Sequence, residues 1–268
     1  MSFETVRAGE LEFLRSDALG AVHCFSTRFG GVSGGCLSSL NLGIHRGDRP
    51  RNVLENYRRL ASAAGFDLRG LVFTHQVHGC EVRPVGRADR GRGLFFPVIG
   101  DCDALVTNEP GVALAVFSAD CGTILLYDPE AGAIGAAHAG WRGTALGIAG
   151  KTAEAMCGRY GCDPKNIRAA LGPCISRCCF ETGPDVPAAM RAAFGPDAEA
   201  AIEAGGEKFR VDLKLLNALS LRRAGVERID VCPDCTCCEP ERFWSHRRAG
   251  DLRGSLAAVV ELPEKERF

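Results

Sequence analysis

Short apolar runs, each followed by a polar or glycine-containing turn, recur along the whole chain. Runs of roughly 4–8 apolar residues bounded by turn residues are typical of β-strands with both faces buried. No linker rich in Pro, Gly or Ser interrupts the series, and no internal repeat or low-complexity segment is present. The pattern predicts strands at residues 21–25, 71–73, 104–107, 113–117, 123–127, 134–137, 167–171, 228–231 and 255–260.

Three longer stretches instead predict helices. Residues 51–66 repeat apolar side chains at the spacing of one helix face. Residues 143–160 are rich in Ala, and residues 212–224 carry leucines on one side and stop at Gly225.

The loops between the runs indicate the type of sheet. Runs 113–117, 123–127 and 134–137 are joined by only five and six residues. Such short links suit antiparallel neighbours, because a parallel crossover needs about a dozen residues or more. We therefore expect an α/β (α+β) fold in which layered, mixed but largely antiparallel sheets carry peripheral helices, and a single domain over residues 1–268.

A thiol and an imidazole follow two of these runs. Cys121 comes soon after residues 113–117, and His138 directly follows residues 134–137. If the two runs are neighbouring strands, both side chains emerge at one edge of a sheet, where a rigid scaffold can present reactive groups. His78 follows an earlier run, and two His with one Cys would form a three-ligand site with an open fourth position, the pattern of a catalytic zinc.

Spacing alone leaves other interpretations open. Dispersed ligands lack the tight local spacing of strong metal motifs, so these residues could equally be ordinary buried or surface side chains. A metal-independent hydrolase or amidase would use Cys121 as nucleophile and His138 as base. His75 competes with His78, because in an extended segment the two point to opposite faces and only one easily reaches the same metal.

Four polar residues near these segments are candidates for substrate contacts or catalysis. Arg142, four residues after His138, stands where the second predicted helix begins, and a helix N-terminus with an Arg favours phosphate. Arg28 precedes a glycine loop and could face phosphate or only close the turn. Asn41 could bind a base or sugar or only cap its loop, and Asp120 could be a general base, orient a ligand or merely end a strand.

The chain contains fourteen cysteines, and their role needs a decision. A secreted disulfide framework usually belongs to a short chain with a targeting signal, whereas this chain can bury a large core and shows no signal-peptide pattern. The second of two cysteine groups contains a Cys-x-x-Cys, so a structural zinc site built from both groups is one alternative, but two well-spaced Cys-x-x-Cys pairs are missing, and reduced, partly buried thiols are favoured. A redox switch that uses these thiols is the remaining alternative. The two groups are Cys174, Cys178, Cys179 and Cys232, Cys235, Cys237, Cys238.

Charge and hydropathy exclude several classes of partner. The 32 Lys and Arg residues nearly balance the 33 Asp and Glu residues, and no basic stripe is present, so a nucleic-acid partner is not expected. No apolar run approaches the roughly 18 residues that cross a bilayer. We expect a cytoplasmic protein without a membrane partner, as a monomer or weak homodimer.

A set of strings distributed along the chain carries a family resemblance. They are STRFGGVS (26–33), SLNLG (39–43), QVHG (76–79), DALVT (103–107), ADC (119–121), HAGWRG (138–143), LGPCI (171–175) and FWSHRR (243–248). Together they are similar to the strings of the YfiH-type laccase-domain family, whose members have been described as multicopper polyphenol oxidases and as zinc-bearing purine nucleoside phosphorylases. The strings span nearly the whole chain, so the resemblance covers it.

The resemblance implies a metal site and a set of catalytic residues. In that family the metal is held by the His of QVHG, the Cys of ADC and the His of HAGWR, which correspond to His78, Cys121 and His138. We assign catalytic roles to Cys121, His138 and Asp120. The resemblance further implies that the site is lined by Arg28, Asn41 and Arg142.

The activity implied by the resemblance is zinc-dependent phosphorolysis of purine nucleosides. The substrates would be phosphate with adenosine, inosine, guanosine and 5′-methylthioadenosine, and adenosine deamination would be a side activity because zinc lowers the pKa of bound water toward about 7. Copper is the alternative metal, in a polyphenol oxidase (laccase). Multicopper electron transfer needs many His ligands, whereas this chain has only six His. A Cys–His hydrolase and a non-enzymatic zinc or redox scaffold are the remaining alternatives.

Overall fold

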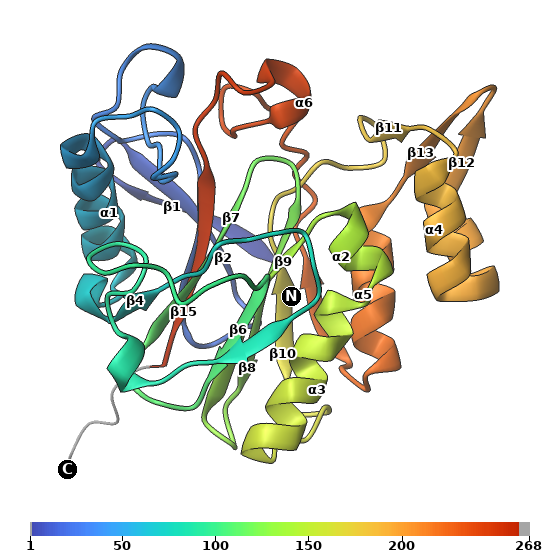
Figure 1. Cartoon of the computed structure of the whole chain (residues 1–268), viewed down its shortest axis with the longest axis horizontal. Coiled ribbons are helices and arrows are strands. Elements are labelled where there is room, and N and C mark those ends of the chain that lie inside the picture. Colours follow the sequence, from blue (N-terminus) through green and yellow to red (C-terminus); the bar gives the residue numbers. More distant parts are fainter. Residues whose placement is uncertain (1, 263–268) are drawn as a thin grey trace.

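Two six-stranded sheets are stacked face to face at the centre of the structure (Figure 1). The computed structural model describes residues 2–262. The first sheet has the strand order β1-β2-β3-β15-β7-β4, and the second has the order β14-β10-β8-β9-β6-β5. The core between them takes side chains from both sheets, among them Phe25 and Val116 from the first and Leu125 and Ile134 from the second.

The bounds of the elements are as follows. The strands are β1 Phe3–Ala8, β2 Leu11–Ser16, β3 Val22–Ser26, β4 Leu71–Val72, β5 Val82–Pro84, β6 Ala104–Thr107, β7 Ala113–Ser118, β8 Gly122–Asp128, β9 Ala133–Ala139, β10 Arg168–Leu171, β11 Glu181–Thr182, β12 Ile202–Gly205, β13 Lys208–Val211, β14 Arg228–Val231 and β15 Leu256–Glu261. The α-helices are α1 Pro50–Ala64, α2 Trp141–Ala145, α3 Ile148–Tyr160, α4 Asp185–Phe194, α5 Leu213–Arg223 and α6 His246–Ala249. Short 3-10 helices span Gly35–Leu37, Leu68–Gly70, Arg87–Asp89 and Gly195–Ala201.

The central strands are apolar on both faces because each sheet is covered on both sides. In β7, Leu114 and Val116 face the core between the sheets, whereas Ala113 and Ala115 join a second core under α1. Strand side chains alternate between faces, so a strand buried on both sides reads as a continuous apolar run. This burial explains the apolar runs in the sequence.

Helices cover the outer faces of the two sheets. Helix α1 packs on the first sheet, begins at Pro50 and ends at Gly65, whose φ of 86° lies in the left-handed region that glycine adopts freely. Helices α3 and α5 pack on the second sheet. A small third sheet, with the order β11-β13-β12, lies with α4 at one end of the molecule (Figure 1).

The predicted fold class is confirmed: layered, mostly antiparallel sheets carry peripheral helices. All nine predicted strands are present, with ends shifted by at most two residues. The pairing inferred from the short links is half right, because β8 pairs with β9 in antiparallel fashion but β7 is a neighbour of neither. Strand β7 pairs with β15 and β4 in the first sheet, whereas β9 pairs with β8 and β6 in the second. The link from β7 to β8 therefore crosses between the layers instead of forming a hairpin.

The predicted helix over residues 143–160 is also corrected. It is two helices, α2 and α3, which are separated by Leu146 and Gly147. Gly147 has a φ of 75°, so the chain turns through a left-handed conformation there. The third predicted helix is present as α5.

Several elements were not predicted because their apolar patterns are weak: β1, β2, β5, the strands of the third sheet, α4 and α6. Strand β1 carries Glu4 and Arg7 and is exposed along much of its length. Its partner β2 contains Glu12, which is buried because Arg7 and Arg242 pair with it.

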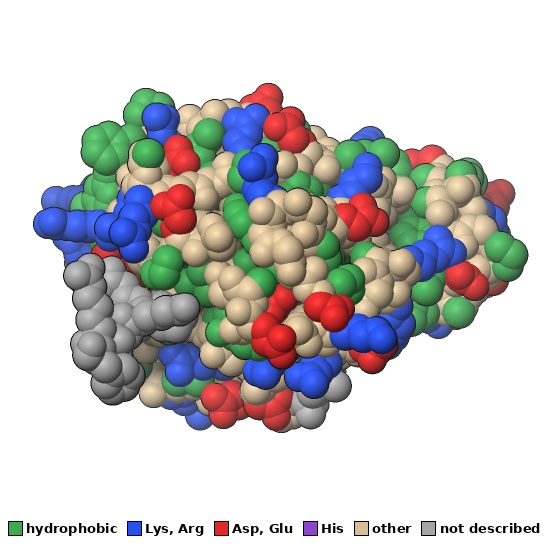
Figure 2. Space-filling view, turned by 90° about the horizontal axis from the view of Figure 1, so that it is seen from below, with side chains coloured by type: hydrophobic (Ala, Val, Ile, Leu, Met, Phe, Trp, Pro, Cys, Tyr) green, Lys and Arg blue, Asp and Glu red, His purple; other side chains and the backbone are tan. Residues whose placement is uncertain are grey.

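The charged side chains on the surface agree with the balance of Lys and Arg against Asp and Glu in the sequence. On the face shown in Figure 2, Lys and Arg side chains alternate with Asp and Glu side chains instead of forming a basic stripe. Within residues 2–262, no helix is both long and apolar enough to cross a bilayer.

All fourteen cysteines fall in this described part, and each is a free thiol, as expected. That residues 1–268 form one domain stays a prediction, since Met1 and residues 263–268 lie outside the described residues.

Candidate active site

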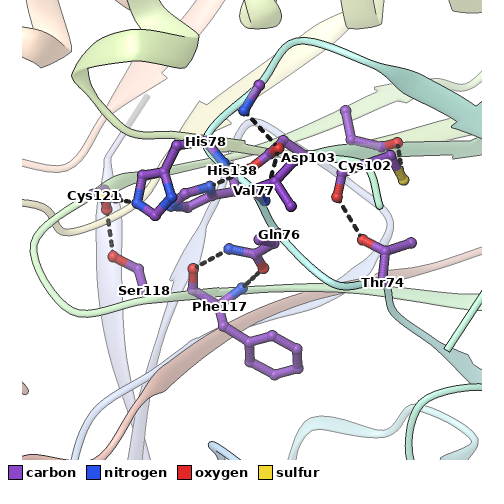
Figure 3. A network of polar contacts seen from close by, with 12 residues as sticks. Thr74, Gln76, Val77, His78, Cys102, Asp103, Phe117, Ser118, Cys121 and His138 are labelled. Carbon is purple, nitrogen blue, oxygen red and sulfur yellow. Dashed lines mark hydrogen bonds and ion pairs between the residues drawn. The ribbon is translucent and has the colours of Figure 1, made fainter. Parts of the chain in front are cut away.

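His78, Cys121 and His138 converge at one point of the structure (Figure 3). Their ligand atoms, the imidazole nitrogens and the thiol sulfur, all lie within 4.8 Å of one another. Cys121 Sγ is 3.9 Å from His78 Nε2. The two imidazole rings are nearly perpendicular, at 87°, and their centroids are 4.8 Å apart. The three side chains could hold one metal ion.

These residues come from separate elements of the two sheets. His138 lies near the end of β9 in the second sheet, where its side chain is almost completely buried. Cys121 lies in the crossing between β7 and β8, and His78 lies in the loop after β4. The cluster therefore forms where the ends of the two sheets meet, and not along one edge of a single sheet.

Asp103 orients both histidines. It is fully buried just before β6, and its Oδ1 accepts a hydrogen bond from His138 Nδ1 at 2.8 Å. The same carboxylate accepts the backbone amides of Val77, His78 and Gly79 at 3.1, 2.9 and 2.8 Å. A carboxylate on the outer nitrogen of a ligating His fixes the ring so that the other nitrogen faces the metal. Asp103 thus supports the cluster from behind.

The loop that carries His78 is fixed by further hydrogen bonds (Figure 3). The side-chain amide of Gln76 makes two hydrogen bonds to the backbone of Phe117 in β7, at 2.7 and 2.9 Å. Thr74 Oγ1 donates to the carbonyl of Cys102 at 2.7 Å. His78 itself has a φ of 60°, which is unusual for a non-glycine residue. The Asp103 and Gln76 contacts offset that strain.

The turn that carries Cys121 is fixed in a similar way. Ser118 Oγ donates to the carbonyl of Cys121. Asp120 has a φ of 95°, and its carboxylate accepts Thr236 Oγ1 at 2.7 Å and the amide of Arg247 at 2.6 Å. Both of its oxygens are therefore engaged in holding the turn.

Electrostatics in the cluster favour a thiolate. Burial disfavours ionisation of Cys121, but the charge and hydrogen bond of His138, helped by His78, lower the pKa of Cys121 to about 6. Burial also opposes protonation of His138, but Cys121 and Asp103 raise its pKa to about 9. Burial raises the pKa of Asp103, but the hydrogen bond from His138 lowers it. The net effect is a pKa below the ordinary value of an Asp carboxyl. The thiolate is the form of Cys that binds metals and acts as a nucleophile.

Gly140 leaves the space in which the ligands sit. A Cβ at this position would lie 2.7 Å from His78 Cδ2 and 3.2 Å from Cys121 Sγ. Its φ of −67° is open to any residue, so the contact, and not the backbone, requires glycine here. Two imidazoles and one thiolate in this space form a donor set for a soft or borderline metal ion.

A cavity of about 300 Å³ opens in front of the cluster. Its lining includes the three ligands together with Arg46 and Arg253. Arg253 is only 8% exposed, and burial, followed by the nearby charge of Arg46, lowers its pKa to about 10. Two guanidinium groups in one small cavity favour an anionic ligand. Neither Arg was found from the sequence.

Aromatic and apolar side chains form another part of the cavity wall. Phe73, Val98 and Phe117 line it together with Gln76 and Thr74. An apolar wall with a few polar groups is typical of small-molecule sites. The cavity thus combines metal-ligating, cationic and apolar surfaces.

Arg28 and Asn41 do not line this cavity. The Arg28 guanidinium donates to the carbonyls of Ser38 and Pro240 and lies 3.8 Å from the ring centroid of Trp244. Asn41 is buried, and its Oδ1 accepts the amides of Gly43 and Ser255. Because Gly43 and Ser255 do line the cavity, Asn41 supports the wall from behind.

Arg142 and His75 also lie apart from the ligand cluster. Arg142 is exposed in α2, a helix of five residues, and its guanidinium lies 4.3 Å from the ring centroid of Trp141. His75 lines the cavity, but its Nδ1 contacts Asp101 Oδ1 at 2.9 Å, outside the ligand cluster. The structure thus brings together the three ligands expected from the sequence and leaves His75 out.

Comparisons with known proteins identify the family of the chain. A family model described as multi-copper polyphenol oxidoreductase laccase matches residues 22–263. The chain belongs to this family. The resemblance seen in the sequence strings is thereby confirmed.

Relatives in this family match nearly the whole chain. The protein named purine nucleoside phosphorylase YlmD of Geobacillus stearothermophilus is 40% identical over 251 residues, which cover 92% of each chain. The protein named purine nucleoside phosphorylase YfiH of Escherichia coli is 37% identical and covers 91% of this chain and 94% of its own. A crystal structure of YlmD from Geobacillus stearothermophilus superposes with a TM-score of 0.92 at 38% identity, covering 97% of this chain and 99% of that one.

Proposed function

We propose that this protein is a zinc-dependent purine nucleoside phosphorylase whose centre is the His78–Cys121–His138 cluster. The observation that carries the proposal is the cavity, which joins this cluster to two guanidinium groups and an apolar wall. These surfaces suit the phosphate, the sugar and the purine of such a reaction. Relatives named purine nucleoside phosphorylase, which match more than nine tenths of the chain, support the proposal.

Zinc is the metal we propose, because two imidazoles and a thiolate with an open fourth position form a typical catalytic zinc set. In a zinc tetrahedron with these ligands, nitrogen and sulfur are about 3.5 Å apart. The 3.9 Å between Cys121 Sγ and His78 Nε2 is close to that value. A bound zinc ion would supply a Lewis acid to the cavity.

Phosphorolysis requires an anion held near the sugar. A phosphate oxygen bonds to C1′ of the ribose, the bond from C1′ to the base breaks, and the base leaves with the electron pair and takes up a proton. We propose that Arg46 and Arg253 hold the phosphate, because both line the cavity. The protein would then stabilise the charge that develops on the reacting atoms. Substrate contacts by Arg28, Asn41 and Arg142 stay predictions.

The polar residues of the cluster have distinct proposed tasks. His138 and Cys121 bind the metal, and Asp103 keeps the His138 ring in position through the 2.8 Å contact. We propose that Asp120 positions Cys121, since Thr236 and Arg247 occupy its oxygens. The substrates proposed are adenosine, inosine, guanosine and 5′-methylthioadenosine, and adenosine deamination is the proposed side activity.

Incubation with inosine tests the proposal. Zinc-loaded protein is mixed with inosine, with and without phosphate, and the products are separated by chromatography. We expect hypoxanthine and ribose 1-phosphate only when phosphate is present. With adenosine, adenine reports phosphorolysis and inosine reports deamination. Absence of phosphate-dependent base release would refute the phosphorylase assignment.

A Cys–His hydrolase is the second candidate function. It is favoured by the thiolate–imidazolium character of Cys121 and His138, whose pKa values are shifted to about 6 and about 9. Copper oxidase chemistry has less support, because the cluster contains only two His. Base release without phosphate, retained after zinc removal and abolished by alkylation of Cys121, would support the hydrolase.

A further inference from the structure

A second group of metal-ligating side chains lies outside the active-site cavity. The thiols of Cys178, Cys179, Cys235 and Cys238 all lie within 4.8 Å of one another. We call these four residues the tetrathiol cluster. They come from two distant segments of the chain, the loop between β10 and β11 and the loop after β14. None of them lines the active-site cavity.

The sulfur spacing in the tetrathiol cluster matches that of a metal tetrahedron. Cys238 Sγ lies 3.5 Å from Cys178 Sγ and 3.4 Å from Cys179 Sγ, and Cys178 Sγ lies 3.8 Å from Cys179 Sγ. Zinc–sulfur bonds of about 2.3 Å at tetrahedral angles place sulfurs about 3.8 Å apart. A disulfide would need about 2.05 Å.

Backbone amides point at one of the four sulfurs. Cys235 and Cys238 form a Cys-x-x-Cys pair, and the amide of Ser176 donates to Cys235 Sγ at 3.3 Å. The backbone amides of Cys237 and Cys238 also point at this sulfur. Amide donors to the first sulfur of such a pair stabilise a thiolate ligand.

Positive side chains surround the loops that carry the four thiols. Arg247 donates to the carbonyl of Cys179 at 2.9 Å, and Arg248 donates to the carbonyl of Cys237 at 2.8 Å. Four thiolates around a divalent ion carry two net negative charges, so nearby guanidinium groups offset part of that charge. The surroundings are therefore compatible with a charged tetrathiolate site.

We propose that Cys178, Cys179, Cys235 and Cys238 bind a second zinc ion, which has a structural role. Four protein ligands fill the tetrahedron and leave no open position, as in structural zinc sites. The ion would join the two loops, which also meet through an isolated backbone β-bridge between Cys174 and Cys235 and through the hydrogen bond from the Thr236 amide to the Cys174 carbonyl.

The proposed structural zinc also supports the active site. Thr236, one residue after Cys235, binds the carboxylate of Asp120, and Asp120 precedes Cys121. The amide of Ile175 donates to the carbonyl of Asp120 at 2.9 Å. A zinc ion that fixes both loops would therefore fix the turn that presents Cys121.

Metal analysis tests this proposal directly. The protein is produced with ample zinc and purified under reducing conditions. Its metal content per chain is then measured by inductively coupled plasma mass spectrometry. We expect about two zinc ions per chain in the wild type, about one in Cys238→Ser and about one in Cys178→Ser. Both substituted thiols are exposed, which limits damage to the fold. Cys36→Ser, an exposed thiol outside both clusters, is the matched control and should keep two.

A second measurement on the unmodified protein avoids reliance on variants. Cobalt replaces zinc, and the thiolate-to-cobalt charge-transfer absorption is recorded during titration with metal. Four of the five thiolates of the two sites belong to the tetrathiol cluster, so filling that cluster should produce most of this absorption. A zinc content that Cys178→Ser and Cys238→Ser leave unchanged, iron in place of the second zinc, or a Cys178–Cys238 disulfide under reducing conditions would each overturn the proposal.

Discussion

The two proposed zinc sites, the active-site cluster and the tetrathiol cluster, would use related ligands for opposite purposes. The first has one thiol and two imidazoles, it borders a cavity of about 300 Å³, and it leaves a fourth position open. The second has four thiols, and none of them lines that cavity. An open site can exchange ligands, whereas a closed one only cross-links the chain. We therefore propose one centre for chemistry and one for stability within the same fold.

The largest effect should come from removing the thiol of the open site. Cys121→Ser replaces the only sulfur ligand of this cluster, so we expect loss of one zinc per chain and a fall of about a hundredfold or more in phosphorolysis, since open zinc sites depend on all three protein ligands. Zinc content and hypoxanthine release from inosine are measured on the same sample. The tetrathiol cluster should keep its zinc. Full activity in a variant without the active-site zinc would contradict the comparison.

The next effect concerns stability and the closed site. Removing zinc from the tetrathiol cluster through Cys238→Ser should lower the free energy of unfolding by roughly 2–5 kcal/mol, the range typical of losing a native cross-link. Urea unfolding followed by circular dichroism measures the change, with Cys36→Ser as the control. An equal stability of the two variants would mean that the closed site does not hold the loops.

Asp103→Asn tests the support behind the open site. The amide keeps the size of the carboxylate but loses its charge, and carboxylates behind a ligating His typically contribute 10–100-fold in metal affinity. We expect a zinc affinity lowered by about that factor at the active site and unchanged at the tetrathiol cluster. Competition with a chromophoric chelator measures both. If both sites weaken equally, Asp103 acts on the fold as a whole.

Paired arginine variants locate the phosphate. Arg253→Gln removes a buried charge in the cavity wall and should raise the KM for phosphate about ten- to a hundredfold, since a charge-assisted contact contributes about 1.5–3 kcal/mol. Arg142→Gln is the matched comparison on the exposed side of α2. Zinc content should be unchanged in both. A larger KM effect at Arg142 would support the prediction that this residue binds the anion and would count against Arg253.

The smallest effect is a pH dependence in metal-free protein. The pKa of Cys121 is lowered to about 6, so its thiolate persists down to about that pH and is lost below it. We expect the rate of Cys121 alkylation by iodoacetamide to fall with a midpoint near pH 6 in the Cys36→Ser background. Peptide mass spectrometry reads the site of modification. A midpoint near the ordinary thiol value of about 8.5 would contradict the proposed interaction with His138.

The contribution of the Cys121–His138 pair to stability depends on pH because the pKa values of both residues are shifted in the folded protein. For Cys121, whose folded pKa is lowered, stability is gained above the ordinary thiol pKa and lost as the pH falls through about 6. For His138, whose folded pKa is raised, stability is present below the ordinary imidazole pKa and lost as the pH rises through about 9. Metal-free protein should therefore be stabilised by this pair between about pH 6 and pH 9.

Much of the fold could be predicted because its central strands are buried on both faces. Runs such as residues 104–107 and 228–231 coincide with β6 and β14. The pairing of β7 was not predictable, because a link of five residues can form a hairpin or cross between layers. Strand β1 was missed since its charged residues interrupt the apolar pattern.

The site could be predicted only as far as its ligands carry a motif. Cys121 and His138 stand close to the ends of predicted strands and within recognisable strings, so the sequence shows them. Asp103 also precedes a strand, but a buried carboxylate looks the same in sequence as a surface one until its partner His138 is known. Arg253 reaches the cavity from a distant segment, so only tertiary structure could reveal it.

One titration tests the central claim, that the open cluster performs the chemistry and the closed cluster does not. Zinc is added back stepwise to metal-free wild type, Cys238→Ser and Cys121→Ser, and phosphate-dependent hypoxanthine release from inosine is measured at each step. We predict that Cys238→Ser reaches its full activity after about one equivalent of zinc, whereas Cys121→Ser stays inactive at every step. Activity in zinc-loaded Cys121→Ser, or none in Cys238→Ser with its active-site zinc bound, would contradict it.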